Sequence, residues 1–362
     1  MGNSDLNKAK GARKDEFYTQ LSDIERELRH YRKHFQGKTV LCNCDDPFES
    51  SFFRYFVLNF NKLGLKKLMA TCYDGSPIAG TQASLFDLGG TSRSEDGRKP
   101  YRAVVTSVRD ATGDGALSMN DIAELFRTGE NSIEELEGNG DYASPECLEL
   151  LDKADIVVTN PPFSQFRAYV LTLVAHRKQF VIIGPRNALH YKEIFPLIRD
   201  NKIWLGYGFQ KDDAYFSIPK ANANDYAKGV YDQETGMVHF RNCIWLTNLD
   251  IKKRHEEMIL VRHYSPDTYT PYDNYDGIDV PNLNEIPCDY SGAMGVPDTF
   301  LSQYNPEQFE IIGIGSGALA KDAGVQRNYR GRTDLAYTKD GINKCPYSRI
   351  LIRNRHPETP EA

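Results

Sequence analysis

The segment Asp155-Ile-Val-Val-Thr-Asn-Pro-Pro-Phe163 is the strongest indication of the fold of this chain. A short run of apolar, β-branched residues is typical of a strand buried in a sheet. The strand must stop at Asn160, because Pro161 and Pro162 lack the N–H that the hydrogen bonds of a sheet need, and the φ of each proline is fixed at about −65°. We therefore expect a stiff loop at the carboxyl end of a strand, where open α/β sheets bind their ligands.

Three groups in this loop suit a planar ring that carries an exocyclic amine. Asn160 supplies a side-chain carbonyl, Pro161 supplies a backbone carbonyl, and Phe163 supplies a flat face. The amine could donate its two hydrogens to the two oxygens while the ring stacks on the phenyl group. A turn at the end of a strand with an incidental Pro-Pro is the simpler alternative.

The composition is that of a globular protein without a membrane span. Of the 362 residues, 40% are hydrophobic and 26% are charged, and no apolar run approaches the roughly 18 residues of a spanning helix. The first ten residues lack the apolar core of a signal peptide. The seven cysteines are scattered, and the one close pair, Cys42-x-Cys44, fits alternation along a strand. We therefore expect reduced thiols, a cytoplasmic location and no metal site.

The net charge of −6 does not indicate nucleic-acid binding, but the charge is unevenly distributed. Between Lys321 and Arg355 there are nine Lys or Arg residues against three Asp residues, an excess of six positive charges. Such a basic segment could contact nucleic-acid phosphates, or it could be a solvated loop. Charge alone does not separate these two interpretations.

Strand and helix patterns alternate along the first two thirds of the chain, which predicts an α/β fold with a doubly wound sheet. Strands are expected at 39–42, 68–73, 101–108, 155–160, 180–183, 203–205 and 243–247. Helices are expected at 15–35, 52–58, 119–126, 132–136, 145–151, 166–175 and 191–199. The alternation ends near residue 255, and the next segment is dense in Tyr, Pro, Asp and Asn. We therefore expect one domain over 1–255 and an irregular region over 256–362.

The tetrapeptide Asn160-Pro-Pro-Phe163 resembles the catalytic motif of methyltransferases that modify amino groups with S-adenosylmethionine. This resemblance implies a Rossmann-like sheet and a catalytic loop made of Asn160, Pro161, Pro162 and Phe163. Two further segments resemble cofactor-contacting motifs of the class. Phe17-Tyr18-Thr19 would contact the methionine part of the cofactor, and Asp141-Tyr142 would hold its adenine. An ordinary helix start and a plain turn before a helix are the alternatives for these two segments.

The segment Asp46-Pro-Phe-Glu-Ser-Ser-Phe52 resembles the Asp-Pro-Phe-x-Gly-x-Gly cofactor loop of the same class, but Ser50 and Phe52 replace the glycines. A side chain at Phe52 should crowd a ligand that lies against the backbone, so either the loop takes another path or the cofactor sits farther out. An Asp-Pro turn that caps the next helix is the alternative interpretation. The residues implied as cofactor contacts here are Asp45, Asp46 and Pro47.

Over nearly the whole chain, the sequence resembles the family of the EcoRI modification methyltransferase. The segments that carry this resemblance are Cys42-Asn-Cys-Asp-Asp-Pro47, Ile156-Val-Val-Thr-Asn-Pro-Pro-Phe163, Ile203-Trp-Leu-Gly206, Trp245-Leu-Thr-Asn-Leu-Asp250, Gly295-Val-Pro297, Asn305-Pro-Glu-Gln-Phe309 and Lys344-Cys-Pro-Tyr347. The glycine-free first loop is itself a trait of that family. Residues 75–100 and 313–343 diverge, so the resemblance leaves the target sequence open.

The resemblance implies methylation of one adenine N6 within a short site of double-stranded DNA, by a monomer that uses S-adenosylmethionine and flips its target base. Basic residues of the C-terminal region would hold phosphates and read guanine edges, and the candidates are Arg327, Arg330, Arg332, Lys344 and Arg349. A restriction endonuclease could share the site without forming a stable complex. Two alternatives stay open: an RNA or protein-glutamine methyltransferase with the same loop, and a catalytically dead fold that only binds DNA.

Overall fold

A computed structural model describes residues 18–44, 50–72, 100–109, 126, 130–209, 213–218 and 230–359 of the chain. The chain divides into two compact units, which we describe separately. Unit 1 comprises Met1–Ala188 and Gly208–Leu249, and unit 2 comprises Leu189–Tyr207 and Asp250–Ala362. Unit 2 therefore includes residues 189–207, which the sequence pattern had placed with the first domain.

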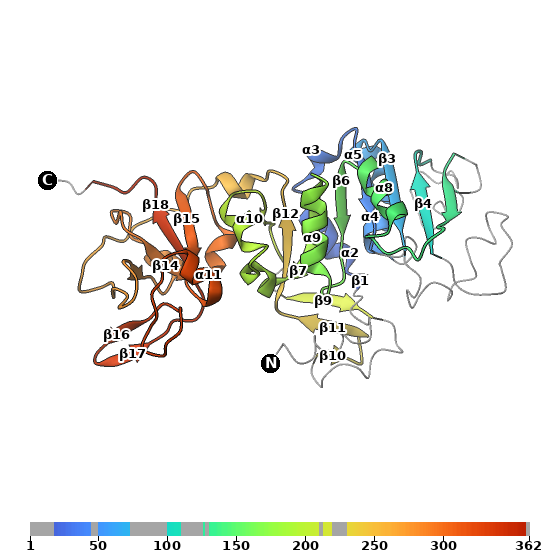
Figure 1. The fold of residues 1–362 in the computed structure, drawn as a ribbon. Coiled ribbons are helices and arrows are strands. Elements are labelled where there is room, and N and C mark those ends of the chain that lie inside the picture. The colour runs from blue at the N-terminus through green and yellow to red at the C-terminus, as the bar shows by residue number, and fades with distance from the viewer. Residues whose placement is uncertain are drawn as a thin grey trace. The chain divides into compact units, whose positions relative to one another are not determined.

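A central sheet organises unit 1 (Figure 1), with its strands in the order β5-β4-β3-β2-β6-β7-β12. The bounds of these strands are β2 Thr39–Cys42, β3 Lys67–Thr71, β4 Tyr101–Val105, β5 Ser132–Glu135, β6 Ile156–Thr159, β7 Gln179–Pro185 and β12 Cys243–Thr247. The four central strands β3, β2, β6 and β7 are parallel, and β4, β5 and β12 pair antiparallel. Every residue of β2 and β6 is buried, as continuous apolar runs in a parallel sheet require.

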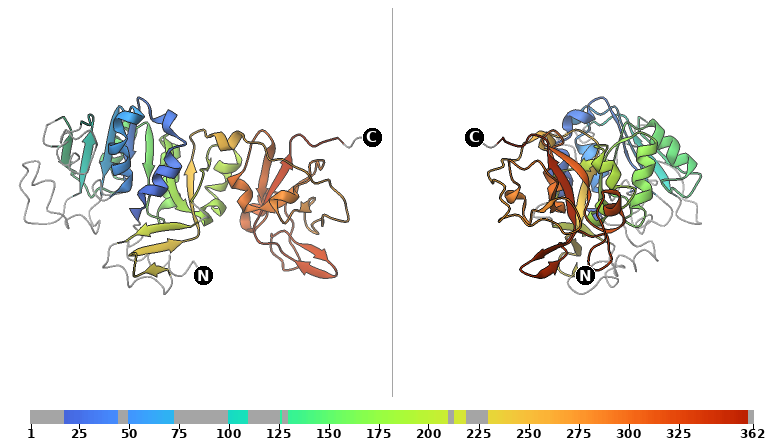
Figure 2. Two further views of the ribbon diagram at one scale, coloured as in Figure 1. Left: turned by 180° about the vertical axis from the view of Figure 1, so that it is seen from behind. Right: turned by 60° about the vertical axis from the view of Figure 1, so that its left-hand side comes forward.

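Helices cover both faces of this sheet. Their bounds are α2 Leu21–Leu28, α3 Arg32–Phe35, α4 Ser51–Leu58, α5 Phe60–Leu63, α8 Pro145–Lys153 and α9 Phe166–Ala175. The helices α8 and α9 lie on the near face in Figure 1, whereas α2 and α4 come forward when the molecule is turned in Figure 2. The prediction of a mixed α/β fold around a central sheet is confirmed.

A small second sheet adjoins the carboxyl edge of the central parallel strands. Its order is β1-β9-β11-β10, with bounds β1 Tyr18–Thr19, β9 Ala214–Ser217, β10 Tyr231–Asp232 and β11 Met237–Phe240. Strand β11 ends three residues before β12 begins, and the Arg186 N–H at the end of β7 donates to the Asn242 carbonyl at 2.7 Å. Because β7 ends where β12 starts, the small sheet lies beside the edge where ligands of α/β sheets bind, as Figure 1 shows below β7.

Several elements differ from the expectations of the sequence. The predicted helix over 15–35 is wrong in part, because β1 pairs with β9 and the helical residues form two short helices. The predicted helix over 132–136 is also wrong, since Ile133 pairs with Ala103 and Glu134 forms an ion pair with Arg102 on strand β4. Within 191–199 only Phe195–Arg199 (α10) is α-helical, after the 3-10 turn η1 (Arg186–His190). The helix expected at 119–126 lies almost entirely outside the described residues.

Unit 2 contains a sheet that the sequence did not predict. Its order is β13-β14-β18-β15, with bounds β13 Ile278–Asp279, β14 Met294–Pro297, β15 Phe309–Ile314 and β18 Arg349–Asn354. The unit also contains β8 Trp204–Leu205, η4 Lys252–His255, η5 Leu283–Glu285, η6 Asp298–Ser302, α11 Gly317–Asp322 and the hairpin β16 Tyr337–Lys339 with β17 Ile342–Lys344. A core of Tyr272, Ala320, Val325, Leu335 and Leu351 supports the sheet. The C-terminal region is thus more regular than expected.

Two further findings concern the whole described chain. No helix in the described ranges is both long and apolar enough to cross a membrane. All seven cysteines are free thiols.

Candidate active site and nucleic-acid interface

Two asparagines leave the central sheet side by side. Asn43 follows β2 and Asn160 follows β6, and the parallel register sets Leu41 beside Val157, two and three residues before them. Both side chains are buried, at 4% and 6% exposure. Strand order reverses between β2 and β6, because β3 extends the sheet on one side and β7 on the other. A pair of polar side chains therefore lies at the switch point of an open sheet, the usual ligand position.

The loop after Asn160 is held by its own backbone. The Pro162 carbonyl accepts from the Gln165 N–H at 3.0 Å, and the Phe163 carbonyl accepts from the Phe166 N–H at 3.4 Å, where α9 begins. Phe163 is 8% exposed, and Pro161 is buried. The predicted catalytic residues therefore lie in one short, ordered connection between β6 and α9.

A close contact with β7 positions the start of α9. A Cβ at Gly184 would lie 2.2 Å from two carbons of the Phe166 ring. Because real Cβ atoms do not come so close to other atoms, only glycine at this position admits the ring. Phe166 is fully buried and follows the catalytic loop directly, so this contact fixes the far end of the loop.

Two tyrosines join the first loop to the segment that was predicted to hold the adenine of a cofactor. The Tyr169 hydroxyl on α9 donates to Asn43 Oδ1 at 2.5 Å, and the Tyr169 ring meets Tyr142 edge-on at 4.8 Å between centroids. Burial, and then the neighbouring Cys44 and Asp141, raise the pKa of Tyr142 to about 12. Tyr142 is thus a neutral, mostly buried ring beside the end of β2, as an adenine-packing residue should be.

Asp141 has a local role as well. Its Oδ1 accepts from the Ala143 N–H at 2.9 Å, and its backbone carbonyl accepts from the Ser144 N–H at 2.9 Å. Ser144 then caps α8, accepting from the Cys147 N–H at 3.3 Å. This is the turn before a helix that was the alternative interpretation, although Asp141 is still half-exposed next to Tyr142.

Strand β1 brings the N-terminal motif to the same edge of the sheet. Thr19 pairs with Phe216, and its side chain is 3% exposed. Within the described part of the chain, the buried Thr19 Oγ1 has no hydrogen-bond partner. A buried hydroxyl without a partner costs free energy, so this atom fits a ligand that supplies a donor or an acceptor. Tyr18, next to it, is half-buried.

Ser50 and Phe52, which replace the glycines of the cofactor loop, both have structural roles. Its side chain is buried and packs edge-on against Trp245 of β12, with ring centroids 6.0 Å apart. Ser50 caps α4, since its hydroxyl accepts from the Phe52 N–H at 3.1 Å and the Phe53 N–H at 3.5 Å. The Phe52 ring therefore belongs to the core of unit 1, and Ser50 is the helix cap. Phe17, Asp45, Asp46 and Pro47 lie outside the described residues.

Sequence reasoning did not identify Asn43 or Tyr169 as members of this site. The available signal was that β2 and β6 are each followed directly by an asparagine. A second group that it missed lies on the small sheet, where the exposed Tyr215 ring stacks on His239 at 4.6 Å and His239 Nε2 contacts Asp213 Oδ1 at 2.7 Å. An exposed, oriented aromatic pair of this kind could contact a base.

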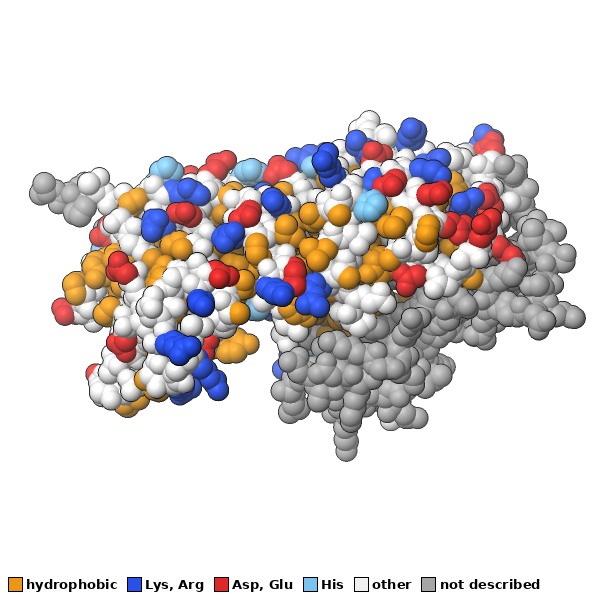
Figure 3. Space-filling view, viewed as in Figure 1, with side chains coloured by type: hydrophobic (Ala, Val, Ile, Leu, Met, Phe, Trp, Pro, Cys, Tyr) orange, Lys and Arg blue, Asp and Glu red, His pale blue; other side chains and the backbone are white. Residues whose placement is uncertain are grey.

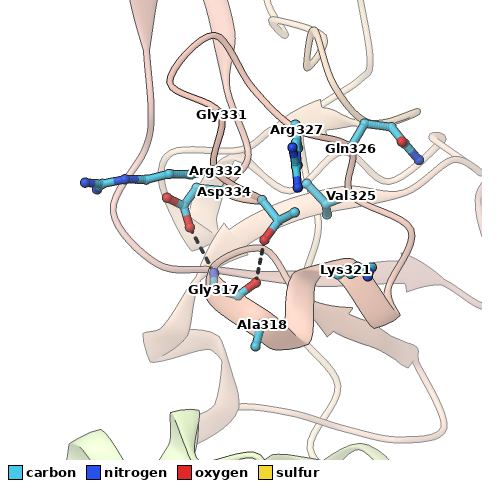
Figure 4. A pocket seen from close by; sticks show the side chains of 10 residues that line it. Gly317, Ala318, Lys321, Val325, Gln326, Arg327, Gly331, Arg332 and Asp334 are labelled. Carbon is cyan, nitrogen blue, oxygen red and sulfur yellow. Dashed lines mark hydrogen bonds between the residues drawn. The ribbon is translucent and has the colours of Figure 1, made fainter.

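In unit 2, a pocket of about 1010 Å³ lies between α11 and the turn at 328–332. Its charged lining residues are Lys321, Arg327, Arg332 and Asp334. The Asp334 carboxylate accepts a hydrogen bond from the Gly317 N–H at 2.9 Å, and the Thr333 hydroxyl donates one to the Gly317 carbonyl. The Asp334 carboxylate and the Gly317 carbonyl are thus both bonded within the wall of the pocket. Figure 4 shows Arg327 among the lining residues, and the Arg332 side chain points away from the part of the pocket where Lys321 lies.

Asn328 builds the turn that presents the predicted DNA-binding arginines. Its Oδ1 accepts from the backbone N–H groups of Arg330 and Arg332, at 2.8 and 3.2 Å. The Arg330 guanidinium lies over the Tyr329 ring, 5.1 Å from its centroid. In the described structure Arg327, Arg330, Arg332 and Lys344 are exposed and form no ion pair. Figure 3 shows Lys and Arg side chains gathered beside the hairpin β16–β17.

Arg349 differs from the other predicted DNA contacts. Its Nε donates to the buried Asp279 carboxylate at 2.9 Å, and the Tyr272 hydroxyl donates to the same oxygen at 2.7 Å. Its side chain is only 13% exposed. Arg353 pairs with Glu310, and Arg355 donates to two backbone carbonyls. Part of the positive charge counted in the sequence therefore holds unit 2 together, and for Arg349 the structure supports an internal role.

Comparison with known proteins assigns the family. Residues 5–355 match the family described as adenine-specific methyltransferase EcoRI. The type II methyltransferase M.EcoRI of Escherichia coli is 41% identical over 97% of this chain and 96% of its own length. M.MgeORF184P of Mycoplasma genitalium is 33% identical, and M.MpnI of Mycoplasma pneumoniae is 31% identical, each over 97% of this chain and 98% of its own length. No solved structure matches the chain.

These similarities confirm the sequence interpretation of a DNA adenine methyltransferase over the RNA, protein-glutamine and non-enzymatic alternatives. They also agree with an enzyme that takes its methyl group from a donor of the S-adenosylmethionine type. The chain belongs to the EcoRI family of adenine-specific methyltransferases.

Proposed function

We propose that this protein transfers a methyl group from S-adenosylmethionine to N6 of one adenine in a short site of double-stranded DNA. The observation that carries the proposal is the buried Asn160 at the switch point, followed directly by Pro161 and Phe163 in an ordered loop. This set of groups would accept both hydrogens of an exocyclic amine and stack on its ring.

A Rossmann-like cofactor site is supported by the residues around Asn43. When bound, S-adenosylmethionine supplies an electrophilic methyl group on a sulfonium. The buried Thr19 hydroxyl without a described partner fits the polar methionine part, and the neutral Tyr142 ring fits the adenine. Asp141 would accept from the adenine amine. Further contacts proposed from the sequence are Phe17, Tyr18, Asp45, Asp46 and Pro47.

The protein would contribute to the reaction more by aligning the N6 amine with the methyl group than by transferring protons. Asn160 Oδ1 and the Pro161 carbonyl would accept from the N6 amine, which directs its lone pair toward the methyl group and converts an intermolecular reaction into an oriented one. Because N6 is unreachable inside a duplex, the target base must be flipped out. Stacking on Phe163 would offset about 1–3 kcal/mol of the cost of unstacking.

Target recognition is assigned by this proposal to residues 256–362, and catalysis to 1–255. Exposed basic residues on the Asn328 turn, the pocket and the hairpin support phosphate and base-edge contacts in unit 2. The residues proposed to contact DNA are Arg327, Arg330, Arg332 and Lys344. Arg349 would act inside unit 2, where it joins the start of β18 to Asp279 of β13.

We further propose that the enzyme acts as a monomer in the cytoplasm. A restriction endonuclease that recognises the same site would cut the unmethylated DNA without binding this protein stably. Neither point is required for methyl transfer itself.

The proposal is tested by incubating the protein with S-adenosylmethionine that carries a radiolabelled methyl group and with unmethylated duplex DNA. Modified positions are then mapped by single-molecule sequencing. We expect N6-methyladenine at one recurring motif. Label in RNA or in a release-factor glutamine, with none in DNA, would overturn the DNA substrate while leaving the chemistry of the Asn160 loop in place.

A further inference from the structure

Three potential metal ligands converge in unit 2, and none of them is among the residues assigned to DNA binding or to methyl transfer. They are His263, Cys288 and Asp289, and one ligand atom of each lies within 4.8 Å of the other two. His263 Nδ1 is 3.2 Å from Asp289 Oδ2 and 3.6 Å from Cys288 Sγ. The imidazole nitrogen is thus the common neighbour of a thiol and a carboxylate.

These two distances are those expected between ligands of a tetrahedral zinc ion. With bonds of about 2.3 Å to sulfur, about 2.05 Å to nitrogen and about 2.0 Å to oxygen, tetrahedral angles separate sulfur from nitrogen by about 3.6 Å and nitrogen from oxygen by about 3.3 Å. Two of the three separations therefore match those in a tetrahedral site, and the ligand atoms of His263, Cys288 and Asp289 all lie within 4.8 Å of one another.

The backbone holds this arrangement in place. Residues Arg262 and Pro287 form a parallel β-bridge, and the Cys288 N–H donates to the Arg262 carbonyl at 2.8 Å. The Tyr264 N–H donates to Asp289 Oδ1 at 2.7 Å, so the other oxygen of that carboxylate is the one that faces His263. Hydrogen bonds that orient a ligand are the usual support of metal sites.

The C-terminal segment offers a fourth ligand. The Glu358 N–H donates to the Cys288 carbonyl at 2.9 Å, and Asn354 Nδ2 donates to the same carbonyl at 3.1 Å. These two hydrogen bonds place the backbone of Glu358, on the chain that leaves β18, beside Cys288.

We propose that His263, Cys288 and Asp289, with Glu358 or a water molecule as the fourth ligand, form a structural site for a zinc-class divalent ion. A thiolate and an imidazole select zinc over magnesium or calcium, which prefer all-oxygen sites. On binding, the S–H bond of Cys288 breaks, an Sγ–metal bond forms, and the proton passes to solvent. The ion ties the 262–264 and 287–289 segments to the chain that follows β18.

This site was not visible in the sequence, where its ligands are spread over 95 positions from His263 to Glu358. The pattern lacks the short spacings that identify zinc motifs. The bridge between Arg262 and Pro287 and the hydrogen bonds beside it bring the histidine to the cysteine.

The test is titration of the full-length, metal-stripped protein with Co²⁺, followed by displacement with Zn²⁺. Tetrahedral Co²⁺ bound to a thiolate has a charge-transfer band in the near ultraviolet and strong visible bands. We expect one Co²⁺ per chain, both sets of bands, and their loss when Zn²⁺ is added. Zinc should also raise the thermal unfolding midpoint of the wild type.

Matched variants identify the ligands. His263 is largely exposed, so His263→Ala should keep the fold, which circular dichroism checks. The variant should nevertheless bind Co²⁺ much more weakly. Loss of a hydrogen-bond partner of a ligand costs about 10–100-fold in metal affinity, and loss of the ligand itself should cost more. Cys288→Ser should remove the charge-transfer band. His255→Ala is the control, because His255 forms a comparable pair with Asp250 at 2.6 Å, and Cys345→Ser is the control thiol. Absence of Co²⁺ bands in the wild type, or their persistence in His263→Ala, would overturn the proposal.

Discussion

At the scale of single residues, the backbone path of the 160–163 loop agrees with the prediction from the sequence: β6 ends before Asn160, and a short turn leads into α9. A buried β-branched run followed by Asn160 and two prolines leaves few backbone conformations, so the local chain determines the result. Asn43 and Tyr169 were missed because their contact joins residues 126 positions apart. Such a pair depends on strand order, which local sequence does not specify.

The stacking role of Phe163 gives a prediction about the flipped base. Phe163→Ala should weaken retention of an extrahelical adenine by about 1–3 kcal/mol, because the ring supplies one stacking face. A duplex with 2-aminopurine at the target position measures this, since its fluorescence rises when the base leaves the stack. Equal fluorescence with the wild type and the variant would count against stacking on Phe163.

Phe52 shows how a motif comparison can mislead about one side chain. From the glycine pattern it should crowd the cofactor, yet the ring packs on Trp245. Phe52→Ala should therefore lower the free energy of unfolding by about 3–5 kcal/mol, as large-to-small changes in cores do. Denaturant unfolding gives this value, and calorimetry with S-adenosylmethionine should show no gain in affinity. Tighter cofactor binding by a stable variant would restore the crowding interpretation.

At the scale of elements, errors in prediction occurred where tertiary pairing overrides local preference. Residues 132–136 have helix-compatible composition, but β4 supplies an edge and Arg102 supplies a partner for Glu134. Tyr18-Thr19 likewise becomes a strand because β9 is available. Apolar runs such as β6 and α9 were predicted correctly, since their burial and period agree with their final state.

The junction between β7 and α9 provides an element-scale test. Gly184→Ala should place a methyl group against the Phe166 ring and destabilise the protein by about 1–3 kcal/mol, the usual cost of overpacking a core. Gly138→Ala is the control, because a Cβ there has nothing within 4 Å. Denaturant unfolding of both variants measures the difference. A neutral result for Gly184→Ala would mean that the ring is free to move.

At the scale of the whole molecule, the net charge of the chain was a poor guide to DNA binding, and the distribution of charge along the sequence was a better one. The basic excess between Lys321 and Arg355 was visible in the sequence, but which arginines face solvent was not. Arg349 and Arg353 look like Arg327 and Arg332 in the sequence, yet the first two form ion pairs inside unit 2. The sheet of unit 2 was missed because its strands are short and separated by long connections.

Salt dependence separates these two groups of arginines. Arg327→Ala and Arg332→Ala should each weaken DNA binding and reduce the slope of log K against log salt by about 1, as loss of one phosphate contact does. Arg353→Ala should leave the slope unchanged, because its guanidinium pairs with Glu310. Fluorescence anisotropy over a series of salt concentrations measures all three. Equal slopes for all variants would contradict the assignment of DNA contacts to the pocket and turn.

We propose that Asn160 aligns an adenine N6 for methyl transfer, and single-turnover methylation of a mapped duplex site tests this role. Asn160→Ala should lower the rate of the chemical step by about 100-fold or more while DNA affinity stays at the wild-type value. Asn282→Ala, an exposed asparagine without a helix-cap hydrogen bond, should behave as the wild type. A wild-type rate in Asn160→Ala would contradict the account.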